Sequence, residues 1–276
     1  MKNLLLRVLT GIVYIAVILI ALFSNLPIFF VVFGCIMMFA LNEFYKNLKI
    51  KEIEVDIILA NALAVSVYSL PVVDLYTTKF TTLPAVVLFA MALFAVELFR
   101  ENEHPFQRIA FALCGIVYVC VPFSLLAFYK VDKVLTVGFS GSDFASLMIL
   151  FLFGFTWVND TFAYLTGMLL GKHPLCPKIS PKKTIEGLLG GFVFTIACAA
   201  ILSHIYMKGL EWQIVGLAVL VVIASTLGDM VESRFKRWVG VKDSGKMLPG
   251  HGGFLDRFDS VIFSIPIFFA YLQMFD

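Results

Sequence analysis

The chain alternates long apolar runs with short polar segments, and this pattern is the first guide to its fold. A membrane-spanning helix needs about 20 mostly apolar residues, and each run approaches this length. The pattern predicts an all-α polytopic membrane protein with about nine transmembrane helices, in which residues 1–276 form a single membrane domain. The nine runs begin near Leu6, Pro27, Asp56, Thr81, Ile109, Phe144, Gly187, Trp212 and Phe258.

Composition supports the membrane prediction. Of the 276 residues, 61% are hydrophobic and 14% are charged, whereas an average soluble domain has about 45–50% and about 25%. The first run begins with basic residues, as a signal peptide does, but its apolar core is long and lacks a small-residue cleavage site. We therefore expect an uncleaved first helix. The net charge is only +2, and we expect no nucleic-acid partner.

The distribution of basic residues predicts the orientation of the spans. With nine spans and a cytoplasmic N-terminus, 17 of the 21 Lys and Arg residues fall in inside segments. This is the positive-inside pattern, and it places the C-terminus outside. Because Lys130 would lie in an outside loop, its replacement by alanine is expected to change little. The four outside residues are Lys79, Lys130, Lys133 and Lys208.

Polar residues divide the chain into two parts with different expected roles. Residues 1–140 hold spans one to five, whose interiors contain few polar groups, and we interpret them as scaffold helices. Residues 141–276 hold spans six to nine, where ionisable residues enter the apolar runs. An ionisable residue at membrane depth is costly and usually marks a functional site. We therefore expect the catalytic helices and loops in residues 141–276.

Two polar clusters occur in the first half of this region. Asn159 and Asp160 lie midway along the sixth run; a helix-packing role is the alternative to a binding role. The loop "KHPLCPKISPKKTIEGLLGG", residues 172–191, brings lysines to the start of the seventh run. Ser180 or Thr184 is expected to cap that helix, with Glu186 in its first turns. Cations beside free N–H groups form a natural phosphate cradle, although a simple positive-inside loop explains the lysines equally well.

The third cluster, Ser225 to Ser260, contains most of the other charged residues within 141–276. Asp229 lies near the inner end of the eighth run, and Asp256 and Asp259 share a face at the start of the ninth. Oxygen-only clusters of this kind suit Mg²⁺, which binds one or two carboxylates together with substrate phosphates. The surrounding cations would offset phosphate charge. The residues thus indicate an enzyme at the cytoplasmic membrane face that acts on a phosphate compound, with a lipid as one substrate.

The segment "SRFKRWVGVKDSGKMLPGHGGFLDRFD", Ser233 to Asp259, resembles the signature of the phosphatidate cytidylyltransferases, also called CDP-diacylglycerol synthases. The signature specifies S-x-apolar-K-R, then K-D-x-small, then H-G-G-apolar-x-D-R-apolar-D, and every specified position is met. The motifs "ND-T-FAY" and "ISPKKTIEG-LGG" are also typical of that family. The resemblance is detailed from about Phe155 to the C-terminus, and before that it is a set of apolar helices.

The resemblance implies that CTP and phosphatidic acid react, with Mg²⁺, to give CDP-diacylglycerol and pyrophosphate. It also implies a homodimer in the bacterial inner membrane, an active site facing the cytoplasm, and room for a second cation such as K⁺. Asp229, Asp256 and Asp259 would hold the metal. The other catalytic candidates are Lys242, Asp243, His251 and Arg257. The substrate-binding candidates are Asn159, Asp160, Lys172, Lys178, Ser180, Lys182, Lys183, Thr184, Glu186, Ser233, Lys236, Arg237, Gly252 and Gly253.

Three alternatives remain at this point. A related CTP-dependent enzyme would use another acceptor, either an ether-lipid phosphate or a polyprenol. An ion-coupled transporter would use Asp160 and Asp229 for ions, although the chain shows no internal repeat of the kind typical of transporters. A non-catalytic membrane scaffold gives no reason for acidic and basic residues to converge on one face.

Overall fold

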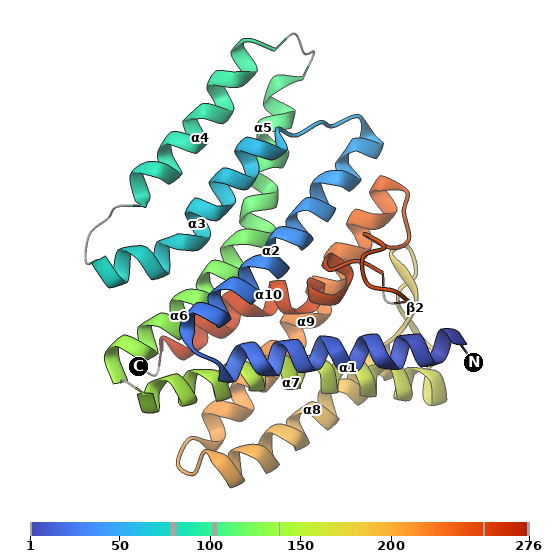
Figure 1. Ribbon diagram of the computed structural model, residues 1–276. Helices are drawn as coiled ribbons and strands as arrows, with labels where there is room; N and C mark the ends of the chain where they lie inside the picture. Colours follow the sequence, from blue (N-terminus) through green and yellow to red (C-terminus); the bar gives the residue numbers. More distant parts are fainter. Residues whose placement is uncertain (1, 78–81, 101–103, 138, 251, 275–276) are drawn as a thin grey trace. The chain divides into compact units, whose positions relative to one another are not determined.

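The computed structural model describes residues 2–77, 82–100, 104–137, 139–250 and 252–274. For residues 2–8, 74–77, 134–137 and 139–142 it describes the backbone only. Helices make up most of the described chain (Figure 1). They are α1 (Lys2–Phe23), α2 (Leu26–Leu48), the 3₁₀ turn η1 (Lys49–Lys51), α3 (Ile57–Thr77), α4 (Leu83–Leu98), α5 (Pro105–Gly115), the π-helical turn η2 (Ile116–Cys120), α6 (Val121–Val137), α7 (Phe139–Leu170), α8 (Ile185–Tyr206), α9 (Glu211–Val239) and α10 (Leu255–Leu272).

The predicted α-helical membrane protein is confirmed in outline. Each predicted apolar run coincides with a helix in the described part of the chain, and the fifth run covers α5, η2 and α6 in succession. Among the described residues, five helices are long and apolar enough to cross a membrane. Three further apolar helices are shorter, at Leu9–Phe23, Ile57–Val73 and Leu83–Leu98. The five longer candidates are Leu26–Lys51, Pro105–Lys133, Asp143–Leu170, Ile185–Tyr206 and Glu211–Val239.

The chain folds as two compact units. The first contains Met1–Leu147 together with Val239–Phe258, and the second contains Met148–Trp238 together with Asp259–Asp276. The segment Val239–Phe258 carries most of the signature recognised in the sequence. It therefore belongs to the same unit as the N-terminal helices, for which a scaffold role remains a prediction.

Helix α2 contributes much of the buried core of the first unit. Its Phe29, Phe33 and Leu41 are fully buried, and the helix contacts α1, α3, α5 and α6. The hydroxyl of Tyr45 donates to the carbonyl of Ala112 over 2.8 Å. A Cβ at Gly115 would lie 2.5 Å from the Tyr45 ring, so glycine is needed where α5 meets the π-helical turn.

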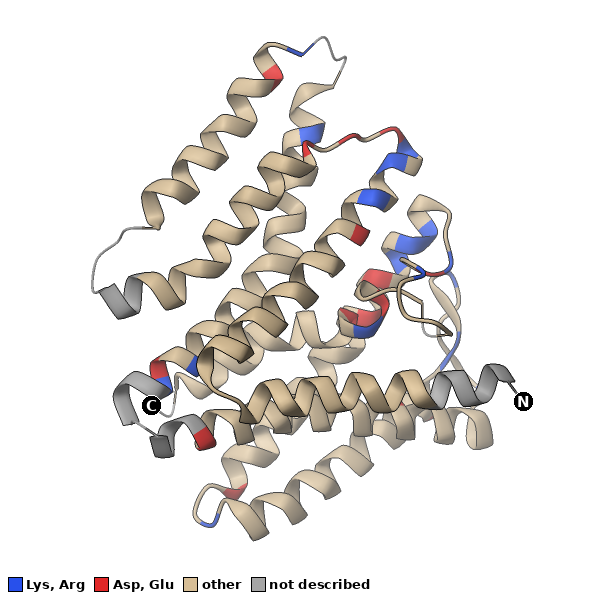
Figure 2. Cartoon of the chain, viewed as in Figure 1, with Lys and Arg blue, Asp and Glu red and all other residues tan. Residues whose placement is uncertain are grey.

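Charged residues of the first unit gather where α2 ends and α3 begins (Figure 2). There Asp56 pairs with Arg100 over 2.5 Å, and Glu97 lies 3.5 Å from Arg108. These ion pairs connect the α2–α3 loop with the end of α4 and the start of α5. They connect helix ends that the charge pattern predicts to be cytoplasmic, and that placement remains a prediction.

Lys130 differs from the solvated loop lysine that the sequence suggested. Its side chain is buried, and its Nζ contacts the Oγ of Ser146 and donates to the carbonyl of Leu22 over 3.2 Å. Lys130 therefore joins the end of α1 to α6 and α7. An alanine here would lose these buried hydrogen bonds, while the expectation that it changes activity little remains a prediction.

In the second unit, α7 and α8 pack closely through glycines. A Cβ at Gly190 would lie 2.2 Å from the Oγ1 of Thr166, and one at Gly191 would lie 2.5 Å from the Oδ1 of Asn159. Side chains at these two positions would therefore prevent α7 and α8 from approaching so closely. Between the helices, β1 (Pro174–Cys176) and β2 (Ser180–Thr184) form an antiparallel hairpin that pairs Pro174 with Thr184.

Candidate active site

The signature segment joins α9 to α10 through a loop shaped by glycines. Gly250 and Gly252 have positive φ angles of 77° and 83°, a conformation that L side chains adopt at a cost. The N–H of Leu248 donates to the carbonyl of Gly252 over 3.0 Å and closes the turn between them. His251, predicted to be catalytic, lies outside the described residues.

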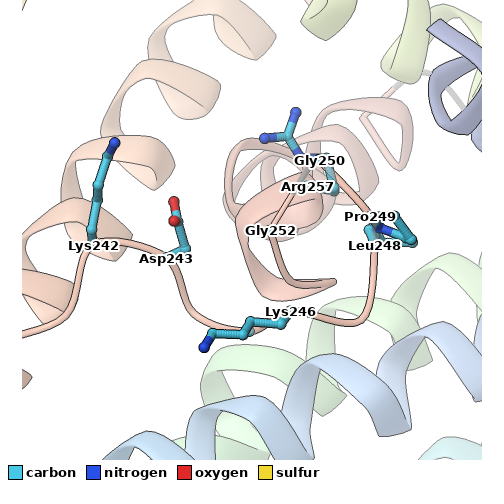
Figure 3. Close-up of a pocket in the computed structure, with 9 residues that line it drawn as sticks. Lys242, Asp243, Lys246, Leu248, Pro249, Gly250, Gly252 and Arg257 are labelled. Carbon is cyan, nitrogen blue, oxygen red and sulfur yellow. The ribbon is translucent and has the colours of Figure 1, made fainter. Parts of the chain in front are cut away.

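This loop borders a cleft of about 580 Å³ in the first unit. Three cations and one carboxylate line it, namely Lys242, Lys246, Arg257 and Asp243 (Figure 3). The excess of positive charge suits an anionic ligand. Of the predicted site residues, Lys242, Asp243, Gly252 and Arg257 lie together around this cleft, and their roles remain predictions.

Asp256 lies in the first turn of α10 and holds the loop in shape. Its Oδ2 accepts hydrogen bonds from the backbone N–H groups of Ser244 and Gly253, each over 2.8 Å. In return, the Oγ of Ser244 accepts from the N–H of Asp256 over 3.2 Å. A residue predicted as a metal ligand is therefore also a structural link between the two ends of the loop.

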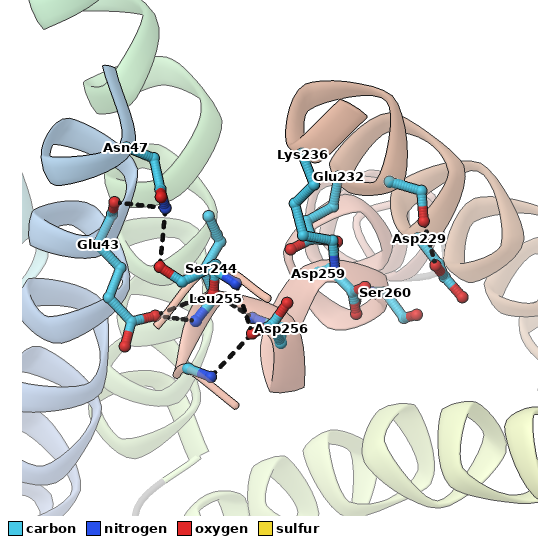
Figure 4. A network of polar contacts seen from close by, with 12 residues as sticks. Glu43, Asn47, Asp229, Glu232, Lys236, Ser244, Leu255, Asp256, Asp259 and Ser260 are labelled. Carbon is cyan, nitrogen blue, oxygen red and sulfur yellow. Dashed lines mark hydrogen bonds and ion pairs between the residues drawn. The ribbon is translucent and has the colours of Figure 1, made fainter. Parts of the chain in front are cut away.

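Two residues that the sequence did not single out reach this loop from α2. The Oε2 of Glu43 accepts from the N–H of Leu255 over 2.9 Å and from the Oγ of Ser244 over 3.2 Å (Figure 4). The Nδ2 of Asn47 donates to the carbonyl of Ser244 over 2.8 Å. The sequence did offer one signal for Glu43, since it is a carboxylate within an apolar run. The interpretation of residues 1–140 as scaffold gave it no role.

The second unit holds another group of predicted site residues. Lys183 on β2 forms an ion pair with the Oδ2 of Asp229 on α9. The Oγ of Ser233 donates to the Oδ1 of Asp229 over 3.3 Å, as their i, i+4 spacing predicts. A lysine from the predicted phosphate cradle is thus brought together with a predicted metal ligand.

Asp259, on α10, belongs to this second group. Its side chain is buried, and its carboxyl group interacts electrostatically with Asp229, Asp160 and Lys236. Lys236 also pairs with the buried Glu232 over 2.5 Å. A Cβ at Gly228 would lie 2.5 Å from the carbonyl oxygen of Asp259, so α9 and α10 approach closely here. Three aspartates therefore contribute negative charge to one region of the second unit.

A sequence profile described as the cytidylyltransferase family matches residues 5–275, nearly the whole chain. The chain belongs to the cytidylyltransferase family. Curated relatives named phosphatidate cytidylyltransferase are 42% identical over 168 residues in Staphylococcus aureus (strain COL) and 40% identical over 168 residues in Staphylococcus haemolyticus (strain JCSC1435). A third, from Staphylococcus saprophyticus, is 41% identical over 172 residues. Each alignment covers 60% of this chain and 60% of the length of the relative.

The geometry gives a physical reason for two small residues in the family signature. A Cβ at Gly245 would lie 2.3 Å from the Oε1 of Glu43, and one at Gly253 would lie 2.2 Å from its Oε2. A side chain at either position would force the Glu43 carboxylate or the loop to shift. The N–H of Gly253 donates to Asp256. The predicted contact of Gly253 with substrate remains a prediction.

The remaining predicted residues lie on or near the α7–α8 hairpin. Thr184 caps α8, accepting from the N–H of Gly187 over 3.1 Å, which confirms one of the two predicted caps. Glu186 accepts from the N–H groups of Lys172 and His173. Asn159 donates to the Oγ of Ser225 over 3.4 Å. Lys178 and Lys182 are exposed, Ser180 begins β2, and Arg237 borders a smaller cleft with Arg234, Phe235 and Trp238.

A hard cation bound to this protein would take carboxylate oxygens as its ligands. Within the described part of the chain, no group of three or more His, Cys, Asp or Glu residues is arranged to hold a metal ion. Mg²⁺ does not need such a cage, because it usually keeps waters and takes one or two carboxylates along with substrate phosphates. The buried Asp259 beside Asp229 and Asp160 fits a site whose charge a cation would offset.

Proposed function

We propose that this protein transfers the cytidylyl group of CTP to phosphatidic acid, giving CDP-diacylglycerol and pyrophosphate. The main support is the cationic cleft formed by residues of the signature, in a chain that a cytidylyltransferase profile matches from residue 5 to 275. The curated relatives carry the name of this activity. An acceptor that is both a lipid and a phosphate suits cations placed beside apolar helices.

The proposed reaction needs little acid–base chemistry. A phosphate oxygen of the lipid attacks the α-phosphorus of CTP, and the bond from this phosphorus to the bridging oxygen of pyrophosphate breaks. The attacking phosphomonoester is already ionised near neutral pH, so no general base is required. The protein would align the reactants and offset charge on the transferring group. Lys242, Lys246 and Arg257 line the cleft with the charges that this requires.

We assign the metal ligands to the three aspartates singled out in the sequence. Mg²⁺ would be held by oxygens of Asp229, Asp256 and Asp259, with substrate phosphates and water completing its shell. The ion would offset negative charge on the triphosphate. Since Asp256 already accepts two backbone hydrogen bonds through Oδ2, we infer that it also fixes the loop. A second cation such as K⁺ would bind at the same carboxylates.

Basic residues outside the cleft are assigned to the phosphates of CTP or the lipid. Lys183 is the best supported, because it already contacts Asp229. The other candidates extend along the hairpin, the α7–α8 region and the end of α9. The basic candidates are Lys172, Lys178, Lys182, Lys236 and Arg237. Further substrate-binding candidates that are not basic are Asn159, Asp160, Ser180, Thr184, Glu186, Ser233 and Gly253, together with Gly252, which lines the cleft.

The membrane arrangement is proposed from the charge pattern and the helices. Nine spans, with the N-terminus and the active site on the cytoplasmic side and the C-terminus outside, agree with the positive-inside distribution. The large exposed side chains of α8, including Val193 and Ile201, suit contact with lipid. We place the protein in the bacterial inner membrane as a homodimer. Mass measurement in lipid nanodiscs tests the dimer, and a mass equal to one chain contradicts it.

The acceptor is tested with purified protein in mixed micelles containing Mg²⁺ and cytidine-labelled CTP. Phosphatidic acid, a diether lipid phosphate and a polyprenol are offered separately at equal concentration. We expect label in the organic phase with phosphatidic acid, dependent on Mg²⁺ and accompanied by pyrophosphate. A strong preference for the diether phosphate or the polyprenol would overturn the proposed acceptor. Ion movement in sealed vesicles without CTP would instead favour a transporter.

A further inference from the structure

Glu43 is a buried carboxylate in a helix that is otherwise largely apolar. Only 4% of the residue is exposed, and it lies in the buried part of α2 beside Phe44 and Tyr45. Burying a carboxylate is costly unless hydrogen bonds compensate. The partners of Glu43 therefore indicate what it does in the fold.

The two hydrogen bonds that described residues donate to the Glu43 carboxylate both come from the signature segment. Its Oε2 accepts from the N–H of Leu255, the first residue of α10, and from the Oγ of Ser244. The first N–H groups of a helix lack partners within the helix, and Glu43 supplies one from a residue 212 positions earlier in the chain. One carboxylate oxygen thus joins the two ends of the loop.

Further contacts connect α2 to the loop near its residues 244–245 and 253–254. Asn47, one turn along α2, donates to the carbonyl of Ser244 over 2.8 Å. Gly245 and Gly253 lie against the two carboxylate oxygens of Glu43, where a Cβ would approach within 2.3 Å and 2.2 Å. Phe39, one turn before Glu43, stacks on Phe254 with ring centroids 4.9 Å apart.

Ser244 connects Glu43 to the candidate catalytic groups. Its N–H donates to the Oδ2 of Asp256, and its Oγ accepts from the N–H of Asp256. Asp243 and Gly245, its neighbours in the chain, line the cationic cleft, as does Arg257. A displacement of Ser244 would therefore shift the carboxylate of Asp256, beside which it lies in Figure 4. It would also shift the lining of the cleft.

We propose that Glu43, assisted by Asn47, is a positioning residue for cytidylyl transfer: it holds Ser244 and the start of α10 so that Asp256 and the cleft residues take their reactive places. This inference rests on the proposed function. It assigns part of the catalytic machinery to α2, within the helices that the sequence suggested were scaffold. Misplacing reacting groups by about 1 Å can cost about 100-fold in rate.

The first arm of the test compares two substitutions at one position. Glu43→Leu keeps an apolar side chain of similar size and removes the acceptor, whereas Glu43→Gln keeps one acceptor oxygen. We expect kcat to fall about 10- to 100-fold in Glu43→Leu and to return to within about fivefold of wild type in Glu43→Gln. A role confined to fold stability predicts an unchanged kcat for the folded Glu43→Leu protein, since leucine suits a buried site.

Glu97→Leu is the matched control, because Glu97 is also a buried carboxylate of the first unit. Its ion-pair partners are Arg100 and Arg108, which lie outside the signature segment. We expect a lower melting temperature for this variant but a kcat within about threefold of wild type. An equal loss of kcat in both variants would overturn the specific role of Glu43.

A double-mutant cycle tests the path through Ser244. If Glu43 acts through its hydrogen bond to Ser244, Ser244→Ala should add less than about threefold to the effect of Glu43→Leu. If the loss of kcat in the double variant equals the product of the two separate losses, this path is contradicted. Coupling of contacting residues is measured directly by such cycles.

Amide hydrogen exchange in nanodiscs separates this inference from the proposed function. We expect residues 243–257 to exchange at least about tenfold faster in Glu43→Leu than in wild type, with little change in Glu97→Leu. Unchanged exchange would overturn the inference, even if wild type makes CDP-diacylglycerol. If Glu43→Leu exchanges faster but wild type makes no CDP-diacylglycerol, the proposed function is overturned and the positioning of the loop by Glu43 remains supported.

Discussion

Lys183 and Asp229 form an ion pair that joins the β1–β2 hairpin to α9, although 46 positions separate them in the chain. Both side chains are about 30% exposed, so solvent reduces the contribution of the pair to stability. The pair nevertheless fixes a cation beside a carboxylate that we assign to the metal. A phosphate entering this region would meet both.

Replacing Lys183 by methionine tests this arrangement. We expect kcat/KM for CTP to fall about 10- to 100-fold, because charge on the phosphates loses one preorganised cation. Stability should change by less than about 1 kcal/mol. Lys208 is an exposed lysine in the α8–α9 connection. The control variant Lys208→Met should keep wild-type kinetics. Equal kcat/KM in the Lys183 and Lys208 variants would remove Lys183 from the substrate site.

Asp256→Asn separates the two roles of Asp256. The amide oxygen of asparagine can still accept from the N–H groups of Ser244 and Gly253, while the negative charge for a cation is lost. We expect a folded protein with a melting temperature close to wild type and at least about 100-fold less activity, not restored by excess Mg²⁺. Substantial turnover by this variant would show that Asp256 is not an essential ligand.

Gly253→Ala tests the close approach of the loop to α2. The added Cβ would lie 2.2 Å from the Oε2 of Glu43 and 2.5 Å from the Oγ of Ser244. We expect a loss of about 1–3 kcal/mol in the free energy of unfolding, as for other overpacked sites, and a large loss of activity.

The matched control for Gly253→Ala is Gly154→Ala, in α7, where a Cβ would meet nothing within 4 Å. Alanine favours a helix by about 1 kcal/mol over glycine, so this variant should be as stable as wild type or more so. Thermal unfolding in detergent measures both variants. Equal stability of the two would contradict the close contact at Gly253.

The sequence predicted the helices and the chemical class of the site for clear physical reasons. Apolar runs of membrane length require helices, because lipid offers backbone groups no partners. The spacing of Asp229 and Ser233 put both on one helical face, and the structure has them hydrogen-bonded. Of the two cap residues predicted for α8, Ser180 and Thr184, the structure has Thr184 at the N-cap.

Contacts between distant parts of the chain were not predictable in the same way. The sequence marks Glu43 as a carboxylate in an apolar run, but it gives no register between α2 and a loop about 200 residues later. It likewise placed Lys130 in an outside loop, whereas the side chain turns inward to the carbonyl of Leu22. The hairpin at residues 174–184 has no alternating pattern, because its strands are short and rich in lysine and proline.

Lys130→Ala should lower stability without lowering the activity of the folded protein. The substitution removes a buried side chain that contacts Ser146 and donates to Leu22, and such losses cost about 1–3 kcal/mol. Lys208→Ala, at an exposed position, should shift stability by no more than about 0.5 kcal/mol. Chemical or thermal unfolding in detergent compares the two. A melting temperature for Lys130→Ala equal to that of Lys208→Ala would contradict the buried contacts.

The proposed orientation is tested at the two ends of α8. In a chain whose five cysteines are replaced by alanine, single cysteines are placed at Lys178 and Lys208. A membrane-impermeant thiol reagent added to right-side-out vesicles should label the cysteine at Lys208, and the one at Lys178 only after permeabilisation. Labelling of both from outside would contradict the proposed orientation of α8 and with it the count of spans.

Transfer of the cytidylyl group itself is tested most directly with CTP labelled either at the α-phosphorus or at the γ-phosphorus. The protein is incubated in micelles with phosphatidic acid and Mg²⁺, and lipid is extracted. Our account predicts that the α-label enters the lipid, while the γ-label stays in the aqueous phase as pyrophosphate. The γ-label in the lipid would identify a kinase, and the absence of both labels from the lipid would contradict the proposed reaction.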